Sequence, residues 1–247
     1  MANSSQEPIS TMLGLSITAI GLRTTNQCME IFQTLQKPMQ LDLLELAIGS
    51  PCDINFDYPD VPIILHDSCL YKDGIRKRLS LQHPQTWRPY AEFIKNHDVR
   101  ALSLHAPLQR DITKHELEIA LSKLEDTLGV PVYVEVMPTE EYWCSSLDTL
   151  VNHPLLLDVS HILIWRQGNL DLTKETCLKL LDSVQVGEIH LSHNKGKADT
   201  HDLIPADVWF AEYIQEWGAN YFVTFESLPK QYAEYERLDK RKFYKNK

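Results

Sequence analysis

The sequence predicts an α/β fold in which eight parallel strands and their helices form one (β/α)8, or TIM, barrel. Eight short runs rich in Val, Ile, Leu and Phe are too apolar for half-exposed hairpins and too short for helices. Most of the gaps between these runs carry the spacing of amphipathic helices. Eight strands with helical crossovers in about 250 residues fit the size of this barrel class. No linker rich in Pro, Gly or Ser divides the chain, so we expect residues 1–247 to form a single domain.

The expected strands are continuous apolar runs, such as Leu-Gly-Leu-Ser-Ile-Thr-Ala-Ile near the start of the chain and Leu-Leu-Leu-Asp-Val after its middle. Such continuous apolarity is typical of parallel strands that are covered by helices. The strands are expected at about 13–20, 41–48, 61–66, 101–105, 131–136, 154–159, 186–191 and 220–226.

The expected helices begin at residues that favour a helix start. Thr-Thr-Asn caps the first helix, prolines open the second and the sixth, and Thr-Glu-Glu places acidic side chains in the first turn of the fourth. The third runs from Asp111 to Gly129, a residue type that commonly ends helices. The helices are expected at 25–36, 84–97, 111–128, 139–151, 171–184 and 205–217, with a charged and aromatic terminal helix at 230–243.

One connection is expected to lack a helix. Between the second and third strands, residues 49–60 contain Ser-Pro-Cys-Asp and Tyr-Pro-Asp, which interrupt a helix too often. The alternative fold is a doubly wound open sheet, which usually has a Gly-rich first turn that binds phosphate. The first turn of this chain, Ala-Ile-Gly-Leu-Arg-Thr-Thr, contains a single glycine, and the barrel is therefore favoured.

The net charge and the cysteines limit which partners and which cellular location we expect for the protein. The chain has 24 basic and 34 acidic residues, a formal net charge of −10, which disfavours general binding to nucleic acid. No apolar run is long enough to span a membrane. Residues 1–10 are polar, lack the regions of a signal peptide and are expected to be a disordered tail. Five cysteines without a Cys-x-x-Cys pair indicate reduced thiols and a cytoplasmic protein.

Histidines and carboxylates gather at the ends of the expected strands, where barrels of this class carry their chemistry. Three of the carboxylates, Glu135, Asp158 and Glu226, are embedded in apolar runs that contain no Lys or Arg. An unpaired buried charge costs several kcal/mol, so bound cations are the simplest way to hold such a cluster at neutral pH. The strand ends and the loop after the seventh strand carry Glu45, His66, His105, Glu135, Asp158, His161, His190, His193, Asp199, His201 and Glu226.

This cluster predicts a site for more than one metal ion. Imidazole and carboxylate groups are ligands that first-row metals prefer, and one ion holds about four to six of them. Nine ligands therefore require two or three ions and a bridging carboxylate, for which Glu135 is the best placed. A polar core without metal is the alternative. The nine expected metal ligands are His66, His105, Glu135, Asp158, His161, His190, Asp199, His201 and Glu226.

The motifs around these residues resemble the xylose-isomerase-like barrel superfamily over residues 13–229. Two of its branches share a nine-ligand set. One is the endonuclease IV family of trinuclear zinc enzymes, which cut DNA at abasic sites. The other comprises the multinuclear non-haem iron-dependent oxidases, which modify cysteine-containing ribosomal peptides, as in methanobactin synthesis.

Three motifs look more like those of the oxidases, namely Val-Gly-Glu-Ile-His-Leu-Ser-His, Asp-Thr-His-Asp-Leu-Ile-Pro and Leu-Leu-Leu-Asp-Val-Ser-His. In the last of these, many oxidases carry Asn where this chain has His161. The eighth-strand ending Phe-Glu-Ser-Leu-Pro departs from the Glu-Trp-Asp that is more usual in that family.

The resemblance implies how the ligands divide among three ions. The first ion would be held by His66, His105 and Glu135, the second by Glu135, Asp158, His190 and Glu226, and the third by His161, Asp199 and His201. It implies iron as the first choice of metal, with zinc or manganese as alternatives. His193 is expected to orient a ligand or carry a proton, or else to be a surface histidine. Glu45 is expected to touch substrate, or else to form a salt bridge with Lys or Arg.

Three functions stay open at this point. The first is an iron-dependent oxidase that acts on a cysteine-containing peptide or a small thiol and activates O2. The second is a redox-inert metalloenzyme, either a sugar isomerase or epimerase or a zinc phosphoesterase of the endonuclease IV type. The third is a non-catalytic barrel that binds metal or serves as a scaffold. The expected partners are a small-molecule or peptide substrate and a protein that presents the peptide; membrane and nucleic-acid partners are not expected.

Overall fold

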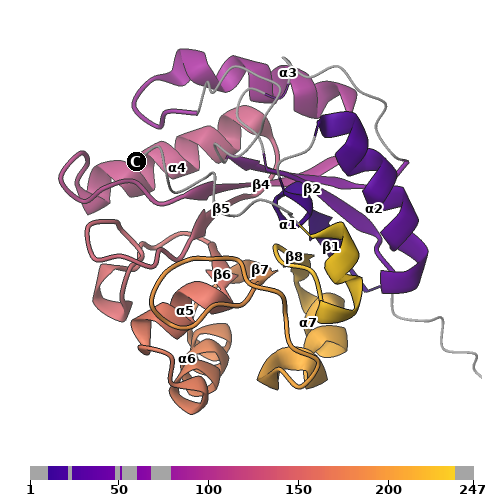
Figure 1. Cartoon of the computed structure of the whole chain (residues 1–247). Helices are drawn as coiled ribbons and strands as arrows, with labels where there is room; N and C mark the ends of the chain where they lie inside the picture. The colour runs from indigo at the N-terminus through magenta and orange to yellow at the C-terminus, as the bar shows by residue number, and fades with distance from the viewer. Residues whose placement is uncertain (1–10, 22–23, 48–50, 52–59, 68–78, 237–247) are drawn as a thin grey trace, which may run out of the picture.

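A computed structural model describes residues 11–21, 24–47, 51, 60–67 and 79–236. Within these residues, eight parallel strands pair in chain order, and the eighth pairs with the first, so the sheet closes into a barrel (Figure 1). The predicted (β/α)8 barrel is confirmed. The strands are β1 (Leu13–Ser16), β2 (Leu43–Ala47), β3 (Ile63–Asp67), β4 (Val99–His105), β5 (Val132–Glu135), β6 (Leu155–Asp158), β7 (Val186–Leu191) and β8 (Phe222–Phe225).

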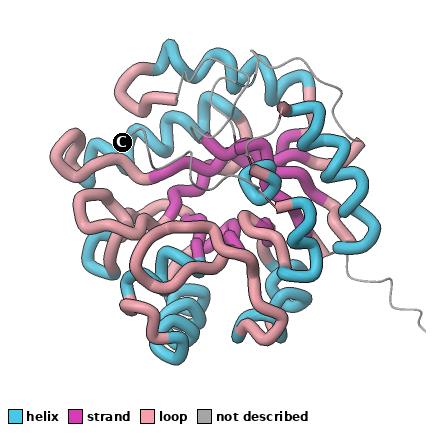
Figure 2. Tube along the Cα trace, in the orientation of Figure 1, coloured by secondary structure: helices cyan, strands magenta, loops and turns pink. Residues whose placement is uncertain are grey.

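Helices surround this barrel, with the strands at its centre (Figure 2). The α-helices are α1 (Ile17–Ile20), α2 (Thr25–Met39), α3 (Arg88–Asn96), α4 (Lys114–Leu128), α5 (Val159–Trp165), α6 (Leu170–Ser183) and α7 (Ile214–Asn220). Short 3-10 helices are η2 (Pro84–Trp87), η3 (Leu147–Thr149), η4 (Trp209–Glu212) and η5 (Lys230–Tyr235). No helix in the described ranges has the length and apolar character to cross a membrane.

Helix α4 shows how local sequence sets the bounds of a helix. The Thr113 hydroxyl accepts a hydrogen bond from the Glu116 amide, and the Glu116 carboxylate accepts one from the Thr113 amide. The helix therefore starts three residues later than Asp111, where the sequence placed its start. It ends at Gly129, whose φ of 69° lies in the left-handed region. Its buried face repeats every three or four residues as Leu117, Leu121, Leu124 and Leu128.

Two of the expected elements are shorter than predicted or absent. The strand expected at 13–20 ends at Ser16, because the Ser16 hydroxyl accepts from the Thr18 amide and caps α1. The prediction of a helix at 139–151 is wrong. This segment forms a loop that contains only the short 3-10 helix η3. There the Thr149 hydroxyl accepts hydrogen bonds from the amides of Ser145 and Ser146, which is a local alternative to helical bonding.

The helices predicted near the C-terminus are also interrupted. The segment 205–217 forms η4 and then α7 in place of one helix, and α7 continues to Asn220. The terminal segment 230–243 begins as η5, and its part after residue 236 lies outside the described residues. The expected tail at 1–10 lies outside them too, as does the expected helix-free connection at 49–60 apart from residues 51 and 60.

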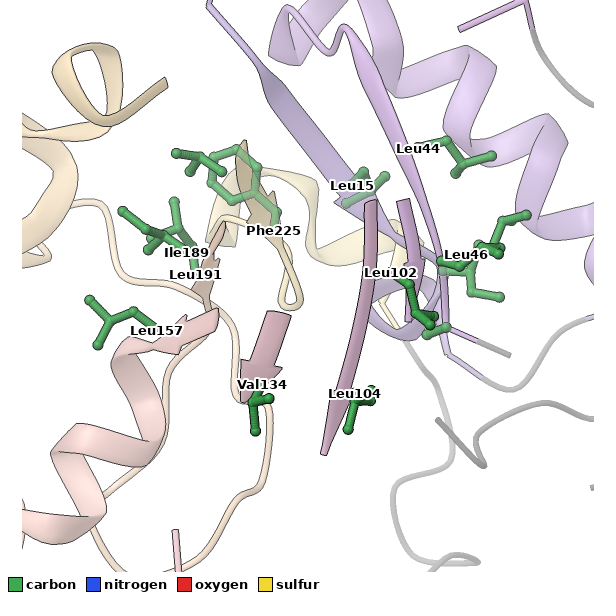
Figure 3. Close-up of a cluster of buried hydrophobic side chains, with 14 of the residues drawn as sticks. Leu15, Leu44, Leu46, Leu102, Leu104, Val134, Leu157, Ile189, Leu191 and Phe225 are labelled. Atoms are coloured by element: carbon green, nitrogen blue, oxygen red, sulfur yellow. The ribbon is translucent and has the colours of Figure 1, made fainter. Parts of the chain in front are cut away.

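The strands separate two apolar regions. Their outward side chains pack under the helices in the main core, which includes Leu15, Leu44, Leu102, Val134 and Ile189 (Figure 3). The inward side chains form a second, smaller cluster, which consists of Leu43, Ile64, Ala101, Tyr133 and Leu156.

Polar residues follow the inward cluster toward the C-terminal ends of the strands. Side chains two residues apart on a strand share a face. The residue two positions after each member of the inward cluster therefore also points into the barrel, nearer the C-terminal end of its strand. Those residues are Glu45, His66, Ser103, Glu135 and Asp158, and all five are buried.

Gly187 makes room for the ring of Tyr133 inside the barrel. The pairing of β6 with β7 shifts register at Gly187. Leu155 pairs with Val186 and Leu156 with Glu188, so Gly187 has no partner of its own in β6. A Cβ atom at Gly187 would lie 2.1 Å from Cε1 of Tyr133, which is too close for any side chain.

We therefore expect Gly187→Ala to lower the free energy of unfolding by about 1–3 kcal/mol through overpacking. Urea titration monitored by circular dichroism measures the loss. The matched control is the double variant Gly187→Ala/Tyr133→Leu, in which the clash is absent. Its loss should be smaller than the sum of the two single losses, and strict additivity would contradict the packing account.

Candidate metal centre

The C-terminal ends of six strands bring the expected ligands together. His66, His105, Glu135, Asp158, His190 and Glu226 lie at or just after the ends of β3 to β8, in that order. His161 follows in α5, and the loop after β7, which crosses in front of β6 to β8 in Figure 1, supplies Asp199 and His201. Seven of the nine line one pocket of about 100 Å³, namely His66, His105, Glu135, His161, Asp199, His201 and Glu226.

The first ligand group is His66, His105 and Glu135, and their ligand atoms lie within 4.8 Å of one another. The Nε2 atoms of the two histidines are 3.2 Å apart, and Oε2 of Glu135 lies 3.2 Å from Nε2 of His105. Ser103 Oγ lies 3.0 Å from Nδ1 of His66 and orients that ring. Three potential ligand atoms thus converge from three neighbouring strands.

The second group contains Glu135 again, together with Asp158, His190 and Glu226. Oδ1 of Asp158 accepts hydrogen bonds from the amides of Ser160 and His161 at 2.6 and 3.0 Å, at the start of α5. Nδ1 of His190 lies 3.2 Å from Oε2 of Glu226. Glu135 therefore belongs to both groups, as expected for a bridging carboxylate.

The third set, His161, Asp199 and His201, is connected through Asp199. Its Oδ2 atom lies 3.4 Å from Nε2 of His161 and 3.1 Å from Nε2 of His201. Nδ1 of His161 donates to the carbonyl oxygen of Val136 at 2.6 Å, so that Nε2 is left to face Asp199. His201 adopts a φ of 46°, in the left-handed region that residues other than glycine rarely occupy. The loop thus holds its histidine in a costly conformation beside the other ligands.

Acidic and imidazole groups surround each other here. The ion pairs of Glu135, Asp158 and Glu226 within the described residues are all with histidines. Burial raises the pKa of Glu135 well above its usual range, and the charge of His161 offsets this only in part. Burial lowers the pKa of His190, but the carboxylates of Glu45 and Glu226 outweigh it and raise that pKa well above its usual value.

Several buried atoms of the expected ligands have no hydrogen-bond partner in the described part of the protein, as expected of atoms that bind a cation. The buried atoms of the described residues that make no hydrogen bond include Oε2 of Glu135, Oδ2 of Asp158, Nε2 of His161 and Nδ1 of His190. In Asp158, His161 and His190 the other polar atom of the same side chain is hydrogen-bonded and holds the group in place. Such orphaned atoms are rare in folded proteins, and metal ligands are held by outer hydrogen bonds in this way. The donor set suits divalent ions.

The two expected catalytic residues differ in burial and in their partners. Glu45 is fully buried, and its Oε2 lies 2.7 Å from Nε2 of His190, so its ion pair within the described residues is with a histidine and not with Lys or Arg. His193 is half-buried after β7, where its carbonyl accepts from the Asp202 amide at 2.6 Å. Burial lowers the pKa of His193, which the charge of Asp202 offsets only in part. Catalytic roles for both residues stay predictions.

Sequence reasoning missed Glu188. This residue of β7 is fully buried, and its Oε1 accepts from the Thr224 hydroxyl at 3.0 Å and lies 3.4 Å from Nε2 of His190. The signal was present, because Glu188 precedes His190 by two positions and so shares its face of the strand. Glu188 lies inside the strand, whereas ligands were expected at the strand ends.

A larger pocket of about 390 Å³ adjoins the centre. His105 lines both pockets and has the most exposed side chain among the residues of the first two ligand groups, at 32%. The larger pocket is mainly apolar, and its other lining residues include Leu79, Leu104, Leu108, Ile112 and Tyr142. A molecule bound there would reach the cluster at His105.

Comparisons with known proteins support the fold. No family model matches the chain, and no curated protein matches it. Among solved structures, endonuclease IV from Thermus thermophilus is similar with a TM-score of 0.54 at 12% identity, over 91% of this chain and 96% of that one. D-allulose 3-epimerase from Methylomonas sp., in complex with D-allulose, is similar with a TM-score of 0.56 at 15% identity, over 91% and 86%. An L-ribulose 3-epimerase gives a TM-score of 0.51 at 14% identity, over the same shares.

These three structures share the barrel fold with this chain. Sequence identities this low are evidence for a shared fold but not for a shared function. They include an endonuclease IV, one of the two branches that the sequence motifs resemble. None of the three is an oxidase, so the comparisons do not support the oxidase branch.

We expect Glu135→Gln to reduce metal occupancy at more than one site, because Glu135 belongs to two ligand groups. Elemental analysis of the purified variant measures this as a loss of more than about one equivalent relative to the wild type. His115→Asn, on the exposed surface of α4, is the matched control and should keep full metal content. Full metal content in Glu135→Gln would show that Glu135 is not a bridge.

Metal affinity should rise with pH. Burial lowers the pKa of His201, but the negative charges of Asp199 and Glu226 outweigh it and raise this pKa to about 9. The folded protein without metal therefore holds a proton on His201 at pH 7, and a metal must displace it. Competition with a chelator should show Zn²⁺ affinity increasing about tenfold or more per pH unit between about pH 6.5 and 8.5. An affinity that is constant over this range would contradict the assignment of His201 as a ligand.

Proposed function

We propose that this protein is a multinuclear metal-dependent enzyme, and that iron in its centre oxidises a cysteine-containing peptide or a small thiol. The observation that supports a multinuclear centre is the position of Glu135, whose carboxylate takes part in two adjoining ligand groups. The choice of an oxidase is supported by the sequence motifs around His190 and Asp199.

The proposed centre assigns every expected ligand. His66, His105 and Glu135 hold one ion; Glu135, Asp158, His190 and Glu226 hold a second; and His161, Asp199 and His201 hold a third. When bound, iron supplies a Lewis acid that favours the thiolate form of a substrate and exchanges electrons with O2. The electrons leave the thiol substrate, and O2 accepts them.

The protein itself supplies position, dryness and a place for the substrate. Ser103 orients His66, and the Val136 carbonyl fixes the ring of His161. Glu135 and Asp158 are buried, so water has little access to the floor of the centre. The apolar pocket beside His105 is the proposed site for the body of the substrate. His193, whose lowered pKa leaves its imidazole neutral at pH 7, is the proposed proton carrier.

A second candidate is a redox-inert metalloenzyme, and a specific observation favours it. The group of Glu135, Asp158, His190 and Glu226 contains three carboxylates and one imidazole, a donor set rich in oxygen that suits Mn²⁺. In such an enzyme the ion polarises a substrate carbonyl or phosphoryl oxygen, and a neighbouring carboxylate or histidine moves a proton. Two of the structures that share the fold are sugar epimerases and one is an endonuclease IV.

We expect the protein purified without added metal or chelator to contain at least about two equivalents of iron per chain. After anaerobic reconstitution with Fe²⁺, its electron paramagnetic resonance signal should change on exposure to O2. Addition of L-cysteine or a cysteine-containing peptide should then increase O2 consumption. Glu135→Gln is the control and should consume O2 no faster than buffer.

Two other outcomes would contradict the oxidase. Zinc or manganese that persists through anaerobic iron reconstitution would favour the second candidate, which is then tested by epimerisation of D-allulose and cleavage of abasic DNA. Less than about half an equivalent of any metal would contradict both candidates.

A further inference from the structure

Two buried carboxylates lie beside His190 and belong to none of the three ligand sets of the proposed centre. Glu45 from β2 and Glu188 from β7 are both fully buried. Oε2 of Glu45 lies 2.7 Å from Nε2 of His190, and Oε1 of Glu188 lies 3.4 Å from the same nitrogen. His190 therefore has one ring nitrogen directed at these carboxylates and the other directed at the centre.

The chemistry of the ring decides which nitrogen can bind a metal. A metal binds His190 only in the neutral form of its ring, which carries one N–H and one lone pair. An ionised carboxylate only accepts hydrogen bonds, so the short contact with Glu45 places the N–H on Nε2. The lone pair is then on Nδ1, which makes no hydrogen bond and lies 3.2 Å from Oε2 of Glu226.

Both carboxylates are themselves held in place. Glu45 pairs with Ser16 in the register of β1 and β2, and its Oε2 is held by Nε2 of His190 at 2.7 Å. Glu188 accepts the Thr224 hydroxyl across the pairing of β7 with β8. Neither carboxylate can turn toward the centre without breaking these bonds, and neither has exposed surface that a substrate could touch.

We propose that Glu45, supported by Glu188, is a positioning residue for His190: it accepts the Nε2 hydrogen, directs Nδ1 at the centre and strengthens metal binding there. This inference rests on the metal centre of the proposed function and is independent of which metal or reaction is correct. It gives Glu45 a role that acts through His190 and not through the substrate.

A different use of the same atoms is a further metal site. Ligand atoms of Glu45, His66 and His190 lie within 4.8 Å of one another and could hold an ion of their own. The two uses require opposite ring nitrogens, because such an ion would take Nε2 of His190, whereas the positioning role leaves Nε2 protonated.

The wild-type protein distinguishes them directly. We expect protein labelled with ¹⁵N-histidine and loaded with ¹¹³Cd²⁺ to show scalar coupling between the metal and Nδ1 of His190, while Nε2 keeps its proton. His190→Asn assigns the signal. Coupling to Nε2 would overturn the proposal in favour of the further metal site.

Variants then measure the strength of the effect. Glu45→Ala removes the acceptor and should lower the Co²⁺ affinity of one site about 10–100-fold, with the other sites unchanged. Glu45→Gln keeps an acceptor oxygen and should recover most of that loss. Glu188→Gln should lower the affinity by less than Glu45→Ala does. Glu92→Gln, on the exposed surface of α3, is the matched control and should bind Co²⁺ as the wild type does.

The outcomes separate this inference from the proposed function. A wild-type protein that binds no metal would contradict the metal centre and this inference together. A wild type that binds metal, with Glu45→Ala unaffected, would overturn the positioning role alone. If Glu45→Ala does not fold, as judged by circular dichroism, the ¹¹³Cd coupling in the wild type still decides the question.

Discussion

The structure depends on one constraint, which is the burial of several carboxylates and imidazoles at one end of a barrel. Glu45, Glu135, Asp158 and Glu188 have almost no exposed surface, and histidines are the ion-pair partners of all four. Burying so much charge without compensation would outweigh the few kcal/mol by which a domain of this size is stable. The polar interior is therefore stable only if cations or protons balance the carboxylates. Divalent ions would achieve this at neutral pH, and two groups of converging side-chain atoms, which share Glu135, could hold them.

Side chains at successive positions along each strand serve different purposes in the barrel. The outward side chains pack under the helices, the first inward layer is apolar, and the next inward layer carries the ligands. Hydrogen bonds with Ser103, with amides at the start of α5 and with the Val136 carbonyl, which accepts from His161, hold one atom of an expected ligand while the other faces the centre. Because these supports lie in β4, in α5 and directly after β5, the side chains of the candidate centre are held in place by the barrel itself.

The alternation of buried strands made much of this arrangement predictable. Eight apolar runs identified eight strands, and their C-terminal ends identified six expected ligands that the structure brings together, because both are local features of the sequence. The prediction of a helix at 139–151 was wrong because the Thr149 hydroxyl accepts hydrogen bonds from two nearby amides. The spacing of apolar residues along the sequence does not reveal such local bonds. The partner of Glu45 could not be predicted, since it is 145 positions away in the chain and depends on how the barrel closes. Glu188 was missed because it lies two positions before His190 inside β7, whereas ligands were expected only at the strand ends.

The central claim is that Glu135 bridges ions in a multinuclear centre. The most direct test is anomalous X-ray diffraction at the iron, zinc and manganese edges from crystals of the protein as purified. The account predicts about two or three anomalous peaks among the nine ligands, with the Glu135 carboxylate within about 2–2.5 Å of two of them. A single peak, or peaks that Glu135 does not contact, would contradict it.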